Sequence, residues 1–155
     1  MFEQSLQPEK WKDQQAAEGR SPGEVECFRI AAVIIAANAV LSFLLSFAAK
    51  AQGLPVLFAL ALSWYLFKLR PRAESLAIGL ALIGAVLGPI VYFWRFPLPQ
   101  ALLQSAGSWG VNGAVLLLLI GKPGVLRRAF AIGAFVVLSG GVFAVSLLGL
   151  LFRRT

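Results

Sequence analysis

Apolar residues along this chain fall into five long runs separated by short polar breaks. The runs cover residues 28–49, 53–67, 75–94, 101–121 and 129–152. A helix that crosses the hydrocarbon core of a bilayer needs about 20 residues, because each residue adds about 1.5 Å. Four runs meet this requirement, and the shorter run 53–67 has Lys50 and Lys68 near its ends, where they can reach the interface. The pattern predicts an all-α integral membrane protein, a bundle of about five transmembrane helices.

The first 26 residues differ from the rest of the chain in charge and polarity. They hold six of the seven acidic residues, all except Glu74, together with lysine, glutamine, glycine and proline. Such a segment has little apolar surface to bury. We therefore expect a short, soluble and flexible N-terminal tail over residues 1–26, in the cytoplasm, followed by a transmembrane bundle over residues 27–155.

Prolines and glycines stand at several of the breaks between runs. Pro55 lies in the first turn of the run 53–67, where its missing N–H costs nothing because that group has no partner inside a helix. Residues 97–99 (Pro-Leu-Pro) separate the third and fourth runs, and residues 122–124 (Lys-Pro-Gly) form a turn before the fifth. These positions indicate separate helices joined by short loops.

The composition agrees with a lipid environment. The chain is 59% hydrophobic and 14% charged, whereas a soluble domain is about half apolar and about a quarter charged. A net charge of +7 in a soluble protein would suggest nucleic acid as the partner. Here the basic residues lie in loops between apolar runs, as they do in proteins that meet anionic lipid headgroups. We expect membrane lipid, and not nucleic acid, as a partner.

The distribution of basic residues indicates how the helices are oriented. With five crossings, ten lysines and arginines lie on the side of the N-terminus and four on the other side. If the run 53–67 returned to its own side, each side would carry seven. Because cytoplasmic loops are rich in lysine and arginine, the sequence favours five crossings of a bacterial inner (plasma) membrane, with the N-terminus in the cytoplasm and the C-terminus outside. Arg153 and Arg154 do not fit, since they would lie outside.

Residues that carry catalysis or bind metals are scarce. The chain has one cysteine, Cys27, and no histidine, so a zinc site of the usual type is hard to build. Catalysis inside a bundle generally needs an ionisable side chain that faces the interior. The interiors of runs two to five contain no such residue. Arg29 lies in the first turn of run one and Glu74 just before run three, so both are at run edges. We expect no catalytic residues, no metal and no cofactor. Cys27 stays a candidate for acylation only.

Small residues at four-residue spacing form stripes on the predicted helices. The candidate helix-packing residues are Gly84, Gly88, Gly110, Gly133, Gly141 and Gly149. Such stripes let helix backbones approach closely, which favours association in lipid. The longest stripe, which we call the glycine ridge, consists of Gly133, Val137, Gly141, Val145 and Gly149. It packs either inside the protein or against a partner subunit.

Uncharged polar residues form a second pattern, which we call the polar seam. Two sets lie at i, i+4 and i+8 and so share a helical face, Asn38, Ser42 and Ser46 in the first run and Gln104, Ser108 and Asn112 in the fourth. These side chains serve either as hydrogen-bonding glue between helices or as a polar path for a small solute, and their lack of charge favours glue. Asn38 and Asn112 lie near the centres of antiparallel segments. We expect both to point inward, either paired directly or bonded to backbone carbonyls.

Two functional hypotheses follow from these patterns. The first is a non-catalytic accessory or structural subunit of a membrane assembly, held to other subunits or to a second copy by its small-residue faces. The alternative is a small channel or transporter component that uses the polar seam. An enzyme ranks below both, because the residues that it would need are absent.

Overall fold

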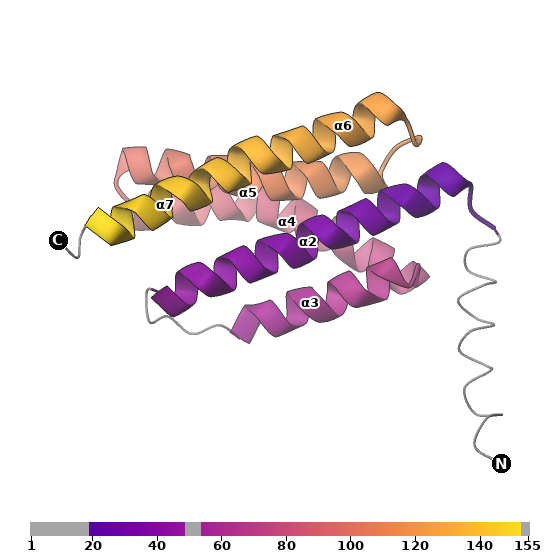
Figure 1. The fold of residues 1–155 in the computed structure, drawn as a ribbon, viewed down its shortest axis with the longest axis horizontal. Coiled ribbons are helices and arrows are strands. Elements are labelled where there is room, and N and C mark those ends of the chain that lie inside the picture. The colour runs from indigo at the N-terminus through magenta and orange to yellow at the C-terminus, as the bar shows by residue number, and fades with distance from the viewer. Residues whose placement is uncertain (1–18, 49–53, 153–155) are drawn as a thin grey trace, which may run out of the picture.

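The structure, a computed structural model, describes residues 19–48 and 54–152, which are helical throughout apart from short turns. The elements are α2 (Pro22–Ala48), α3 (Leu54–Phe67), α4 (Pro71–Arg95), α5 (Leu98–Leu119), α6 (Val125–Ala134), the π-helix η2 (Phe135–Gly140) and α7 (Gly141–Phe152). Consecutive helices run in opposite directions, and α6, η2 and α7 follow one another as a single helix (Figure 1). The start of α2 and the end of α7 therefore lie at opposite ends of the bundle (Figure 1).

Four of the helices are long and apolar enough to cross a membrane, as the sequence predicts. Their apolar stretches are Pro22–Leu44, Arg72–Arg95, Leu98–Leu119 and Val125–Gly149. The short run forms α3, an apolar helix of 14 residues that lies beside α2 and returns from its far end towards its start (Figure 1). It is a continuous helix, shorter than the four candidate spans.

Helices α2, α4 and α5 begin earlier than the apolar runs, and each has a proline in its first turn. Pro22, Pro71 and Pro99 occupy first-turn positions, where a proline ring is already in helical geometry and its missing N–H has no role. Before α2, Ser21 and Glu24 form a capping box. The Ser21 N–H donates to the Glu24 carboxylate at 2.8 Å, and the Glu24 N–H donates to the Ser21 hydroxyl at 3.4 Å.

The capping box moves the predicted boundary between tail and bundle. Residues 22–26 belong to α2 and not to a polar tail, so the boundary at residue 26 is wrong by several residues. The apolar pattern does not predict this part of the helix, because the cap at the N-terminus, and not apolar burial, stabilises it. The rest of the predicted tail, residues 1–18, lies outside the described residues.

Helix α5 is the centre of the bundle and packs against α4, α2 and the final helix. About half of the side chains in the core are small, and the buried alanines among the described residues are Ala31, Ala32, Ala39, Ala73, Ala77, Ala81, Ala101, Ala114 and Ala131. Leu66 and Val115 are the largest fully buried hydrophobic side chains. A core of this kind gains its contacts from close approach of the helix backbones, as in other bundles rich in small residues.

Two of the predicted packing glycines lie at the interface between α4 and α5. A Cβ atom at Gly84 would lie 2.8 Å from the Asn112 amide, and one at Gly88 would lie 2.7 Å from the Ser108 hydroxyl. Moving four residues forward along α4, from Gly84 to Gly88, moves the contact four residues back along α5, from Asn112 to Ser108. The two contacts therefore follow one antiparallel register. The polar side chains of α5 thus rest in the space that these two glycines leave open on α4.

A third packing glycine brings α5 against the final helix. A Cβ atom at Gly110 would lie 2.7 Å from Cβ of Leu138 and 3.3 Å from the carbonyl oxygen of Ala134. Leu138 belongs to η2, a π-helical segment that the apolar pattern does not predict. π-Helical turns are wider than α-helical ones and commonly mark a local constraint. Here the segment faces the closest point of contact with α5.

The glycine ridge lies on the outside of the bundle. Gly133, Gly141 and Gly149 are exposed, and a Cβ atom added to any of them would meet no atom within 4 Å. Val137 is 71% exposed and Val145 is 52% exposed. Of the two arrangements expected for the ridge, packing inside this chain is therefore wrong. Residues four apart drift by about 40° in an α-helix, and the wider turn of η2 reverses part of this drift, so the ridge stays on one face.

The turn between α3 and α4 closes within a few residues through a left-handed leucine. Leu69 has a φ of 58°, in the region that glycine prefers and that costs other residues about 1–2 kcal/mol. The Leu69 N–H donates to Leu66 and the Arg70 N–H donates to Tyr65, at 2.9 and 3.1 Å, which are the two bonds of a Schellman motif. Burial of the Leu69 side chain offsets the backbone strain.

A pair of glycine substitutions tests which face of each helix is packed. We expect Gly110→Ala to destabilise the protein by about 1–3 kcal/mol, because the new methyl group meets a Cβ atom and a backbone carbonyl that cannot move freely. Gly141→Ala is the matched control, with open space at its Cβ, and should leave stability unchanged or raise it by about 0.5–1 kcal/mol through helix propensity. Thermal unfolding in mild detergent measures both. Equal midpoints for wild type and Gly110→Ala would contradict the close contact.

Candidate functional site

Hydroxyl groups join neighbouring helices at three interfaces. The Ser63 hydroxyl donates to the Ala32 carbonyl between α3 and α2 at 2.7 Å, Ser108 to Gly84 between α5 and α4 at 3.1 Å, and Ser139 to Gly107 between η2 and α5 at 3.1 Å. Each acceptor belongs to an alanine or a glycine, whose small side chain leaves its carbonyl open to a neighbour. In an apolar surrounding such a bond is worth about 0.6–2 kcal/mol. These serines therefore act as glue between helices.

Trp109 supplies a hydrogen bond that the backbone of α4 lacks. Pro89 lies inside α4 and has no N–H to donate to the carbonyl of Ala85, four residues earlier. The Trp109 indole N–H donates to that carbonyl at 2.9 Å. Trp109 is 53% exposed, so it does not belong to the buried core. Its indole instead satisfies the acceptor that Pro89 leaves free.

Asn38 and Asn112 line the same cavity, but their side chains do not form a hydrogen bond with each other. The Asn112 amide donates within its own helix, to the Ser108 carbonyl at 2.9 Å and the Ser108 hydroxyl at 3.1 Å. Of the two arrangements expected, the backbone carbonyl is the one that Asn112 adopts. Asn38 makes no hydrogen bond to any described residue and faces a cavity of about 160 Å³ between α2, α3, α4 and α5.

The other members of the polar seam do not extend this cavity. Ser42 is exposed, Gln104 is half-buried without a hydrogen bond to a described residue, and the side chain of Ser46 lies outside the described residues. The described side chains therefore form a short polar cluster around Ser108 and Asn112 and not a continuous path. Ser105, which the seam does not include, is 1% exposed and its hydroxyl has no partner among the described residues.

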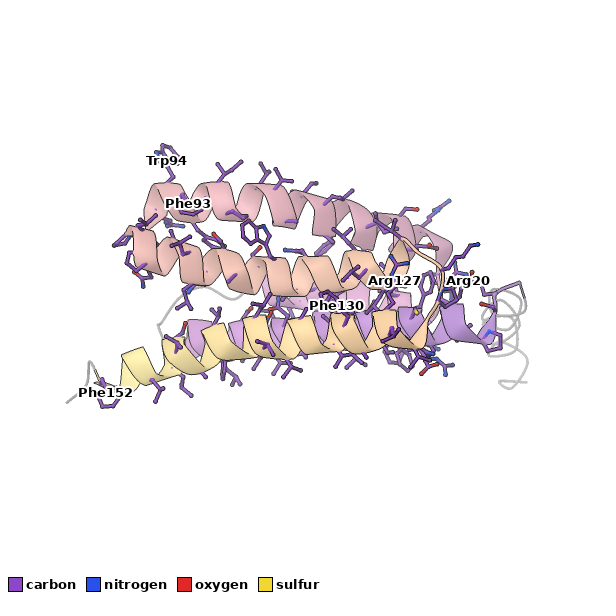
Figure 2. All side chains as sticks on the ribbon, turned by 90° about the horizontal axis from the view of Figure 1, so that it is seen from above. Arg20, Phe93, Trp94, Arg127, Phe130 and Phe152 are labelled. Carbon is purple, nitrogen blue, oxygen red and sulfur yellow. The ribbon has the colours of Figure 1, made fainter. Side chains whose placement is uncertain are left out.

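Charged residues gather at one end of the bundle. The Arg20 guanidinium pairs with Glu74 at 3.0 Å and lies 4.1 Å from the ring centroid of Phe28, and Arg128 pairs with Glu26. These ion pairs connect the start of α2 to the starts of α4 and α6. Figure 2 shows Arg20 and Arg127 at this end and Phe93, Trp94 and Phe152 at the other.

A cavity of about 270 Å³ opens at this charged end, and its lining includes Arg20, Glu24, Cys27 and Glu74. Both of its carboxylates are engaged, Glu74 by Arg20 and Glu24 by the backbone of Ser21. Cys27 is 3% exposed, which separates its thiol from an acylating partner. The ion pair and the cap give this cavity the composition of a structural junction between α2 and α4.

Sequence reasoning missed Ser63, Ser139 and the role of Trp109. A lone serine in an apolar run carries one usable signal, which is that its hydroxyl must find an acceptor. Pro89 carries another, because a proline inside a helix leaves one carbonyl for a neighbour to satisfy. Neither signal names the partner.

No family model matches this chain, and no curated protein or solved structure with which it was compared matches it either. The functional assignment therefore depends on the geometry alone.

A double-mutant cycle tests the link between Pro89 and Trp109. Trp109→Phe removes the indole donor and leaves the Ala85 carbonyl unsatisfied, so we expect a loss of about 1–3 kcal/mol. In a Pro89→Ala background residue 89 supplies its own N–H, and the same substitution should cost less than half as much. Trp94→Phe, at a tryptophan that is 94% exposed, is the control and should be silent. Equal costs in the two backgrounds, measured by thermal unfolding in detergent, would refute the link.

Proposed function

We propose that this protein is a non-catalytic, multi-pass membrane protein that acts as a structural or accessory subunit, and that it binds another transmembrane helix through the glycine ridge. The observation that carries the proposal is the position of the ridge. It consists of small residues at regular spacing, it faces outward, and the described part of the chain leaves it uncovered.

The dimensions of the ridge suit a helix partner. From Gly133 to Gly149 the chain rises by about 24 Å, which is most of the hydrocarbon thickness of a bilayer. A helix that crosses the same membrane can lie along the whole length and make close backbone contact at each glycine. The partner is a helix of another subunit or of a second copy of this chain.

The use of the polar groups also supports a structural role. Ser63, Ser108 and Ser139 donate to backbone carbonyls of neighbouring helices, and Asn112 bonds within its own helix. A channel or transporter needs a continuous row of polar groups that a solute can reach, whereas Asn38 and Asn112 are the polar residues among the described ones that line this cavity. The transport alternative therefore has weaker support than the structural one.

The charge distribution supports an orientation for the bundle. The described end that holds the start of α2 carries eight basic residues and three acidic ones, whereas Arg95 is the one described base at the opposite end. By the positive-inside rule we place the basic end in the cytoplasm of a bacterial cell, with α3 as a fifth, short crossing of the inner membrane.

Single-cysteine labelling tests this topology. In a Cys27→Ala background, cysteines introduced for Arg72 and Lys122 should react only after the membrane is permeabilised, and a cysteine for Arg95 should react with an impermeant reagent in intact cells. Arg72 and Lys122 serve as internal controls for each other, because α4 and α5 lie between them. Labelling of all three positions from the same side would rule out alternate crossings of α4 and α5.

Substitution on the ridge tests the association. Gly141→Leu places a bulky side chain at the centre of the ridge, where this chain itself has room, so thermal stability of the isolated protein should not fall. If a partner helix packs there, overpacking by about 1–3 kcal/mol should weaken its retention about fivefold or more. Co-purification in mild detergent and cross-linking measure retention. Gly79→Leu is the matched control, because Gly79 lies on α4 and a Cβ atom there also meets no atom within 4 Å. Unchanged retention in Gly141→Leu would show that the ridge faces lipid only.

A further inference from the structure

The cavity that Asn38 faces lies where α2, α3, α4 and α5 meet. It encloses about 160 Å³, and an apolar cavity of about 150 Å³ is large enough for a benzene ring. Most of its lining is apolar, and Leu62, Ala77 and Val115 are buried members of that lining. The cavity therefore has the size and the walls to hold one small ring.

Two asparagine side chains give this cavity its polarity. Asn38 of α2 and Asn112 of α5 both line it, and both are half-buried. The Asn38 amide makes no hydrogen bond to a described residue. The Asn112 amide nitrogen donates to Ser108, but no described residue donates to the Asn112 side-chain oxygen. Among the described residues, the cavity thus offers a donor and an acceptor to one polar group inside apolar walls.

The unused amide of Asn38 contrasts with the other polar groups of the bundle. An amide in apolar surroundings costs free energy unless it is hydrogen-bonded. Ser63, Ser108 and Ser139 avoid that cost by donating to backbone carbonyls of neighbouring helices. Leucine at position 38 would occupy a similar volume without any such cost. The fold does not use the Asn38 amide, whereas a molecule in the cavity can.

An apolar groove between α3 and α4 leads to the cavity. It encloses about 400 Å³, and Phe58 and Leu62 line both spaces. On α4 the lining of the groove reaches Leu76, and the lining of the cavity begins at Ala77. The groove exists because α3 packs mainly on α2 while α4 packs mainly on α5. A lipid-soluble molecule can enter from the bilayer along this groove, and a chain attached to its ring has apolar surface to lie on.

We propose that this cavity binds the ring of a lipid-soluble phenol, whose hydroxyl donates to the Asn112 oxygen and accepts from the Asn38 amide, and whose alkyl chain lies in the groove between α3 and α4. The ring matches the size of the cavity, and one phenolic hydroxyl both donates and accepts. The ligand is uncharged, in agreement with a lining that contains no ionisable side chain among the described residues. A toluene ring has the same shape but forms neither hydrogen bond.

Thermal unfolding of the full chain in mild detergent tests the proposal, with para-octylphenol and para-octyltoluene as the probes. The two compounds differ only by a hydroxyl in place of a methyl group, so the toluene corrects for effects on the detergent. We expect octylphenol to raise the midpoint saturably and to bind about tenfold more tightly than octyltoluene, because two hydrogen bonds depend on the hydroxyl. A shift that does not saturate, or equal shifts from the two compounds, would overturn the proposed site.

Two amide substitutions separate ligand binding from helix packing. Asn38→Leu should weaken octylphenol binding about fivefold, and it should not lower the midpoint without ligand, because Asn38 has no hydrogen bond to a described residue to lose. Gln104→Met is the control, since it removes a half-buried amide of α5 that does not line the cavity. Unchanged binding in Asn38→Leu, or the same loss in Gln104→Met, would refute the role of Asn38. A lower midpoint of ligand-free Asn38→Leu would assign the amide to packing instead.

A substitution in the groove separates the ring from the chain. Ala61→Phe fills the groove from an exposed position of α3 that does not line the cavity. It should weaken binding of octylphenol and leave binding of phenol itself unchanged. If octylphenol binds this variant like wild type, or if phenol loses as much affinity as octylphenol, the groove does not hold the chain. None of these results depends on a partner at the glycine ridge, which lies on α6, η2 and α7.

Discussion

The bundle depends on close approach between the backbone of α5 and the helices on either side of it. At Gly84 and Gly88 on α4, and at Gly107 and Gly110 on α5, the absence of a side chain is what allows the neighbouring residues to fit. Because lipid tails are as apolar as the side chains, close packing and hydrogen bonds replace the hydrophobic effect as the source of association between helices in a bilayer. The association of these helices therefore rests on these few positions.

Close approach also decides how the polar groups are used. A serine hydroxyl is short, and it reaches a carbonyl of the next helix only where that helix presents alanine or glycine, as Ala32, Gly84 and Gly107 do. The same holds at Pro89, which leaves the Ala85 carbonyl without a donor in its own helix. The Trp109 indole of the adjacent helix donates to that carbonyl. The described interior is left with little polarity to offer a solute, and the glycine ridge is not covered by any described residue.

The charged end has a different role from the apolar bundle. Its ion pairs tie the start of α2 to α4 and α6, which lie far from it in sequence. Using Glu26 and Glu74 for these pairs leaves an excess of basic residues around the α3–α4 turn. These contacts hold the helix ends together, and among the described residues of this end the bases outnumber the acids by eight to three.

The sequence by itself determined the helices, the loops between them and the smooth faces at Gly84, Gly88 and Gly110, because run length, proline position and four-residue spacing are properties of the local chain. Only the tertiary structure decided that the glycine ridge faces outward, that Asn112 bonds within its own helix, and that Trp109 serves Ala85. A stripe of small residues says that a face is smooth, but it does not say which helix lies against it. The hydrogen-bond acceptors are backbone carbonyls, which every residue has. Pro89 marks one carbonyl of its own helix as free, but the sequence does not say which neighbouring helix will meet that carbonyl.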